Sequence, residues 1–143
     1  MSVLENLILI AQDEKQSSYR RRQAVVDLLK DHQQSDKTFA VVEKLCESKD
    51  NYFIREIVGT LKGIDNPLVL PSLRLALASD DDYVKRDVIQ ILSKVGTSED
   101  LVALKALCEV KAYSVASAAK QAVDDLATRF EVLEKTEVNE AQV

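Results

Sequence analysis

Apolar residues recur along the chain at intervals of about 30 residues, in step with the tyrosines. The chain has four tyrosines, spaced 33, 31 and 30 residues apart: Tyr19, Tyr52, Tyr83 and Tyr113. An apolar side chain stands nine positions after each of them: Leu28, Leu61, Leu92 and Ala122. A fixed period of this length is typical of stacked repeats, because each repeat is one supersecondary unit that must pack against its neighbours. The sequence therefore predicts a solenoid rather than a fold with one central core.

Helix-capping and helix-ending residues divide each period into two helices. The predicted helices cover about 2–14, 18–32, 36–48, 51–63, 67–78, 81–95, 98–110 and the segment from 113 onward. Three polar residues stand where side chains cap helix N-termini: Ser35, Asn66 and Thr97. Pro67 suits a first helical position, whereas Pro71, one turn later, should bend the helix or loosen its first turn. Gly63 suits the left-handed conformation that often follows a helix.

Short linkers join these helices in pairs. Each pair should form an antiparallel hairpin, and similar linkers should stack one hairpin on the next. We therefore expect an all-α fold, a right-handed α-solenoid of about four helical hairpins. Leu61 and Leu92 are expected at the centre of the stack. The apolar pattern fades near Lys135, which predicts one domain over residues 1–135 and a flexible acidic tail over 136–143.

The third repeat carries a resemblance to a known family. Residues 80–92 read DDDYVKRDVIQIL, an aspartate-containing turn followed by tyrosine, valine, arginine and an apolar stripe. Over about residues 2–127 the chain resembles HEAT-like repeat proteins, and especially the bilin-lyase subunits of cyanobacterial light-harvesting antennae. The fourth repeat departs from the pattern, because residues 113–119 contain no arginine. The resemblance implies that the second helices line a concave surface and that the partner is another protein. For a bilin-lyase subunit, that partner is a phycobiliprotein of the phycobilisome.

Charge and hydropathy narrow the class of partner. Residues 1–64 carry 10 basic and 10 acidic side chains, and residues 65–143 carry 9 and 14, so the net charge of −5 arises in the second half. The only basic run is Arg20–Arg22, and its side chains point in different directions around a helix. We therefore expect no nucleic-acid binding. The N-terminal apolar stretch has no basic leader and is broken by Glu5, Asn6 and Gln12, so we expect a cytoplasmic protein without a membrane span.

Residues capable of catalysis or metal binding are few. His32 is the only histidine and falls near a helix C-terminus, where a cation is favoured, so we interpret it as structural rather than as a ligand. Cys46 and Cys108 lie two repeats apart, too far to form a disulfide, and we interpret them as reduced, buried thiols. No nucleophile elbow, phosphate-binding loop or metal-ligand spacing is present. We predict no catalytic, cofactor-binding or metal-binding residues.

The repeated arginines and tyrosines have both a structural and a functional interpretation. The arginines Arg22, Arg55 and Arg86 either bond turn carboxylates of a neighbouring repeat or face a ligand. The carboxylates in question are Asp50, Asp81 and Asp82. The tyrosines either pack between repeats or form a cage around a chromophore. We favour the structural interpretation for both sets.

The function that we expect is non-catalytic: a protein–protein interaction scaffold or adaptor. The alternative is a subunit or relative of a bilin lyase that acts on a phycobiliprotein. The predicted protein-binding residues lie on the second helices and in the last helix: Gln23, Asp27, Glu56, Thr60, Asp87, Gln90, Phe130 and Leu133. The first six stand four, seven or eight residues after a tyrosine and form a mildly acidic strip, which could equally be a solvated helix face.

Both ends of the chain carry apolar residues beyond those that a plain stack needs. In the helix over 2–14, these are Val3, Leu9 and Ile10. Either another chain covers them or the next repeat wraps more of this helix. In the last helix, Phe130 and Leu133 either fold back as a cap or dock a partner. The predicted partner is therefore another protein or a second copy of this chain, bound through either end.

Overall fold

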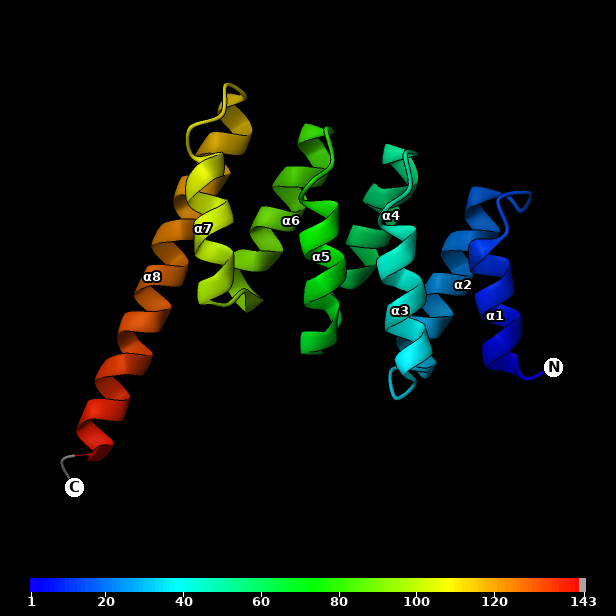
Figure 1. The fold of residues 1–143 in the computed structure, drawn as a ribbon, viewed down its shortest axis with the longest axis horizontal. Coiled ribbons are helices and arrows are strands. Elements are labelled where there is room, and N and C mark those ends of the chain that lie inside the picture. The colour runs from blue at the N-terminus through cyan, green and yellow to red at the C-terminus, as the bar shows by residue number, and fades with distance from the viewer. Residues whose placement is uncertain (142–143) are drawn as a thin grey trace. The chain divides into compact units, whose positions relative to one another are not determined.

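The computed structural model describes the backbone of residues 1–141 and the side chains as far as Glu131 (Figure 1). Within that part of the chain the fold is all-α, as predicted, and is built of helical hairpins like those of an α-solenoid. The elements are α1 Val3–Gln12, α2 Ser18–Asp31, α3 Asp36–Leu45, α4 Asn51–Leu61, the 3₁₀ helix η1 Pro67–Val69, α5 Leu70–Ala76, α6 Asp82–Val95, α7 Ser98–Leu107 and α8 Tyr113–Ala141. Each predicted helix is present, and most end a few residues earlier than the pattern indicated.

The chain divides into two compact units, and the boundary falls inside α6. The N-terminal unit covers Met1–Val88, and the C-terminal unit begins at Ile89. The single domain over 1–135 and the flexible tail over 136–143 stay predictions. Helix α8 continues through residues 136–141, beyond the point where we expected the helical pattern to end, and residues 142–143 lie outside the described part.

Two layers of helices make up the N-terminal unit. Helix α3 packs against both α1 and α5 in one layer, and α2 packs against α4 in the other (Figure 1). Between the layers lie large side chains with almost no exposed surface: Leu28, Leu29, Phe53, Ile57, Leu61 and Leu73. Leu28 and Leu61 are the positions nine residues after a tyrosine in the repeat pattern. The predicted burial of Leu61 is confirmed.

The C-terminal unit has its own apolar core. Helices α7 and α8 pack against each other in this unit. Its fully buried leucines come from all three of its helices and are Leu92, Leu104 and Leu126. Leu92 has no exposed surface, which confirms the predicted burial of this residue as well.

The predicted helix caps are confirmed. Ser35 Oγ accepts a hydrogen bond from the backbone N–H of Lys37 at 3.3 Å, and Asn66 Oδ1 accepts one from Leu68 at 2.9 Å. Thr97 and Asp100 form a capping box at the start of α7, with Asp100 Oδ2 2.8 Å from the Thr97 backbone nitrogen. The residues around Pro71 begin as η1 and continue as α5, so the first turn is loosened as expected.

The prediction of a left-handed glycine at the end of α4 is wrong. No glycine within the described backbone has a positive φ, and α4 ends at Leu61 with Lys62 as its C-cap. Gly96 is required for a different reason. A Cβ atom on Gly96 would lie 2.5 Å from the carbonyl oxygen of Leu92, because the chain turns tightly out of α6.

Candidate protein-interaction surface

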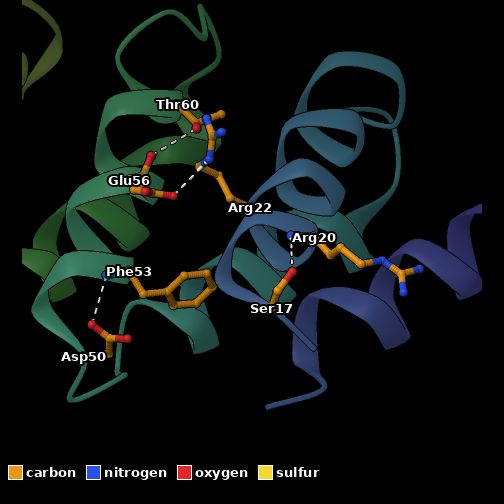
Figure 2. Close-up of polar contacts among 7 residues, drawn as sticks. All are labelled: Ser17, Arg20, Arg22, Asp50, Phe53, Glu56 and Thr60. Atoms are coloured by element: carbon orange, nitrogen blue, oxygen red, sulfur yellow. Dashed lines mark hydrogen bonds and ion pairs between the residues drawn. The ribbon is translucent and has the colours of Figure 1, made fainter. Parts of the chain in front are cut away.

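Four of the predicted protein-binding residues lie together on the neighbouring helices α2 and α4. Gln23 is exposed, and Asp27, Glu56 and Thr60 are half-buried. The Gln23 amide Nε2 lies 3.5 Å from Asp27 Oδ1, one turn further along α2. Thr60 donates its hydroxyl hydrogen to the backbone oxygen of Glu56 at 3.1 Å on α4 (Figure 2). We call these four residues the α2–α4 strip.

An ion pair joins the two helices of the strip. Arg22 extends from α2 to α4, and its Nε lies 2.9 Å from Glu56 Oε2 (Figure 2). Both side chains are partly shielded from water, with exposed fractions of 37% for Arg22 and 24% for Glu56. The contact is an ion pair rather than an aligned hydrogen bond, because Glu56 Oε2 has no hydrogen-bond donor with suitable geometry among the described residues. The pair links α2 and α4 beside the strip.

The expected pairing of arginines with turn carboxylates is therefore wrong for Arg22. Its partner is a glutamate on a helix, while the turn aspartates cap their own helices. Asp50 Oδ1 accepts a hydrogen bond from the backbone N–H of Phe53 at 3.2 Å (Figure 2). It accepts another from the backbone N–H of Tyr52 at 3.1 Å. The Asp81 carboxylate caps α6 in the same way. A cap satisfies N–H groups that have no partner inside the helix, so this use competes with an arginine for the same oxygens.

Arg55 also departs from the expected pairing. Its guanidinium lies 4.7 Å from the centre of the Tyr83 ring, which belongs to the next repeat of the N-terminal unit. That contact packs Tyr83 between two repeats, as expected of the tyrosines. None of the four tyrosines is buried, however, because their side chains are mostly exposed, from 57% for Tyr83 to 84% for Tyr113. The tyrosine at the first turn of each second helix points toward water. In α4 and α6 the residue that follows the tyrosine, Phe53 or Val84, is buried and fills the core instead.

The other predicted protein-binding residues are not brought to the strip by any described contact. Asp87 is half-buried on the part of α6 in the N-terminal unit, and Gln90 is exposed in the C-terminal unit. Phe130 is half-buried on α8, and the side chain of Leu133 lies outside the described part.

Arg129 is a structural residue that sequence reasoning missed. Its guanidinium donates to the backbone oxygens of Lys94 and Gly96, and it also stacks 5.2 Å from the centre of the Phe130 ring. These bonds tie α8 to the C-terminal end of α6 within the C-terminal unit. A cation beside helix-terminal carbonyls is favourable, so an arginine next to the apolar stripe of α8 was the available signal.

Polar side chains link successive turns in the N-terminal unit. Asn51 donates to Asp80 Oδ1 at 3.0 Å and accepts from the Ser79 hydroxyl at 3.2 Å. Asn66 donates to Gln33 Oε1 at 3.2 Å, between two turns 33 residues apart. These asparagine bonds connect repeats where arginine–aspartate bonds were expected. Sequence reasoning missed them because amides are common in turns for purely local reasons.

The cysteines and the histidine lie largely as expected. Both cysteines are free; Cys46 is buried and Cys108 is half-buried. Burial, with a smaller contribution from the Glu43 carboxylate, raises the pKa of Cys46 to about 12. His32 is the C-cap of α2, and its backbone oxygen accepts from the Thr38 hydroxyl at 2.8 Å.

Over the described part of the chain, no group of three or more histidine, cysteine, aspartate and glutamate side chains could hold a metal ion. None of its helices combines the length and the apolar composition that crossing a membrane would require.

Consecutive helical hairpins joined by short turns define a helical-repeat protein. Comparison with known families identifies the type of repeat. Residues 41–124, more than half of the 143-residue chain, match HEAT repeats, and the chain belongs to this family. Helical repeats of this kind present extended surfaces that commonly bind other proteins. No curated protein and no solved structure matches the chain.

Proposed function

We propose that the chain is a non-catalytic adaptor that binds another protein through its second helices and its terminal apolar surfaces. The observation that carries this proposal is the Arg22–Glu56 ion pair, which links α2 and α4 and orders the two side chains beside the strip. A surface that is already ordered loses less conformational entropy when a partner binds. The strip then offers amide, hydroxyl and carboxylate groups at fixed positions, and Asp87 and Gln90 extend the same pattern of positions into α6.

Exposed apolar side chains on α1 support a second contact area. The exposed fractions of Val3 and Leu9 are 69% and 51%. The outer helix of a repeat stack is normally polar, and exposed apolar patches mark interaction sites. The occupant is another protein or a second copy of this chain. A dimer that becomes monomeric when both residues are replaced by aspartate, measured by sedimentation, would identify the second copy.

Affinity capture from cells of the source organism, followed by mass spectrometry, tests the adaptor proposal. The bait is the full chain, compared with its Gln23→Arg and Gln34→Arg variants. Both glutamines are exposed, but only Gln23 lies on the strip, and Gln34 is in the turn after α2. We expect Gln23→Arg to lose the partner at an unchanged melting temperature and Gln34→Arg to retain it. Equal capture by both variants would rule out the strip as the binding surface.

A bilin-lyase role is the second candidate, supported by the exposure of the four tyrosine rings. Exposed aromatic faces are available to stack on a conjugated ligand. Mixing the chain with free bilin, with and without a phycobiliprotein, tests this role through the absorbance spectrum of the bilin. An unchanged spectrum in both mixtures would count against the lyase and leave the adaptor proposal intact.

A further inference from the structure

A cleft of about 760 Å³ opens in the N-terminal unit, beside the turns that join the two helices of its first two hairpins. It is separate from the α2–α4 strip and shares no residue with it. Six charged side chains line it: Glu14, Arg21, Lys44, Glu47, Lys49 and Asp50. Three are basic and three are acidic, so the cleft has no large net charge.

Arg21 is held rigidly at this cleft. Its Nε donates a hydrogen bond to the backbone oxygen of Ala11 at 3.0 Å, near the C-terminal end of α1. The guanidinium also stacks 4.2 Å from the centre of the Phe53 ring, which is fully buried. One contact fixes the Nε edge and the other fixes the plane of the group. An arginine fixed in this way loses little conformational entropy when it binds a ligand.

These contacts leave the outer edge of the guanidinium, formed by Nη1 and Nη2, for a ligand. Among the described side chains, neither nitrogen has a hydrogen-bond or ion-pair partner, although three carboxylates line the same cleft. The Asp50 carboxylate caps α4 through Oδ1. Two parallel N–H groups at the edge of a guanidinium match the two oxygens of a carboxylate.

We propose that this cleft binds one carboxylate of a partner protein, an aspartate or glutamate side chain or a chain terminus, in a bidentate pair with Arg21. This inference rests on the proposed function, and it adds a second binding site and the chemistry that the site recognises. Lys44 and Lys49 favour the negative charge at the cleft. Glu14 and Glu47 suit amide or basic groups beside it.

The mixed charge of the lining favours a polypeptide over a phosphate-rich ligand. A nucleic-acid strand brings one negative charge per nucleotide, and the three acidic side chains of the cleft offset the attraction of its three basic ones. A peptide can carry one carboxylate for Arg21 and neutral or basic groups for the acidic residues. Electrostatic complementarity of this kind selects a partner more than it adds affinity.

Selection from a random peptide library on the intact chain tests the site, with Arg20 as the matched control. Arg20 is the neighbouring arginine on α2, but it is exposed and extends away from Phe53 (Figure 2). We expect the selected peptides to share an acidic residue at one position. Arg21→Lys should weaken binding of a selected peptide roughly 10- to 100-fold, since it replaces a charged bidentate pair by a point charge. Arg20→Lys should leave the affinity unchanged.

If Arg21→Lys lowers the stability of the chain, the site can still be tested by changing the peptide instead of the protein. Replacing the shared acidic residue of the peptide by its amide should weaken binding to the unaltered protein by the same factor. The inference is overturned if no peptide is selected, if the amide peptide binds within about twofold of its parent, or if inorganic phosphate competes as well as acetate. It is also overturned if the two lysine variants bind alike. Capture of a cellular partner by the Arg21→Lys bait, together with any of these results, would leave the adaptor proposal standing.

Discussion

Leu61 and Leu92 stand at the same position of two successive repeats, nine residues after a tyrosine, and both are buried. Replacing either by alanine removes contacts that the surrounding core cannot fully restore. We expect each variant to lose about 2–5 kcal/mol of unfolding free energy. Because a domain of this size has only about 5–15 kcal/mol in total, the loss should appear as a much lower melting temperature. Urea and thermal unfolding followed by circular dichroism measure it.

Leu68→Ala is the matched control for Leu61→Ala, since it makes the same chemical change in the same unit. The Leu68 side chain is 49% exposed, so the expected loss is within about 0.5 kcal/mol. If the melting temperatures of Leu61→Ala and Leu92→Ala equal that of the control instead of lying well below it, the assignment of these leucines to the core of the repeat would be wrong.

The buried thiol of Cys46 should make the folded protein less stable at alkaline pH. Burial raises the pKa of its thiol from 9.0 to about 12. Above pH 9 the unfolded chain gives up this proton while the folded chain keeps it, so the unfolded state binds fewer protons. The free energy of unfolding should then fall by about 1.4 kcal/mol per pH unit from this group until the folded thiol also ionises.

The variant Cys46→Ala isolates that contribution, because tyrosines and lysines titrate in the same pH range. Urea unfolding at pH 8.5 and 10.5 should show a steeper decline in stability for the parent than for the variant. Parallel declines would mean that the folded thiol ionises near its ordinary pKa.

The junction between helices α6 and α7 depends on Gly96. A Cβ atom there would lie 2.5 Å from the Leu92 oxygen and 3.1 Å from Asp100 Oδ2, which belongs to the capping box of α7. We expect Gly96→Ala to lower the free energy of unfolding by about 1–3 kcal/mol, because either the backbone of α6 or the capping box of α7 must shift to make room for the methyl group. Gly63→Ala meets no atom within 4 Å and should change stability by less than about 1 kcal/mol. Comparable melting temperatures for the two variants would contradict this account of the junction.

Helices and caps were the elements that the sequence predicted best. Periodicity, N-cap residues such as Ser35 and Thr97, and the prolines act locally, so a single stretch of sequence contains the information. Gly63 shows the limit of this reasoning. A glycine after a helix fits several C-terminal geometries, and the structure uses one without a left-handed residue.

Contacts between repeats were predicted less well than the helices. Repeat spacing placed Arg22 correctly near the next repeat, but it could not decide between Asp50 and Glu56 as the partner. That choice depends on whether the turn carboxylate is already used by a cap, which only the three-dimensional structure reveals. The cleft at Arg21 was missed for a similar reason, because its ring contact with Phe53 joins residues 32 positions apart.

The all-α repeats and the membership of the HEAT family follow from a sequence pattern that runs through most of the chain. The identity of the partner does not follow from that pattern. The residues of a binding surface suit one partner, whereas the apolar core positions are shared by many repeat proteins with different partners. The α2–α4 strip, Asp87, Gln90, Phe130 and Leu133 therefore remain predicted binding residues.

Truncation of α8 tests whether its last apolar residues stabilise the fold or bind a partner. Arg129 bonds the carbonyl oxygens of Lys94 and Gly96 and stacks on the half-buried ring of Phe130. Ending the chain after Arg129 removes that ring and Leu133, so we expect a lower melting temperature. Ending it after Lys135 keeps both residues and removes only the acidic segment, and this control should melt like the full chain.

The same two truncations, used as baits, separate the remaining outcomes. If the chain that ends at Arg129 melts like the full chain but no longer captures the partner, Phe130 and Leu133 dock that partner. If its melting temperature falls and the control also melts early, residues 136–143 contribute to the folded domain, and the boundary at residue 135 is wrong. A helix that continues to Ala141 makes this control necessary, because helical structure alone does not show that a segment packs on the core.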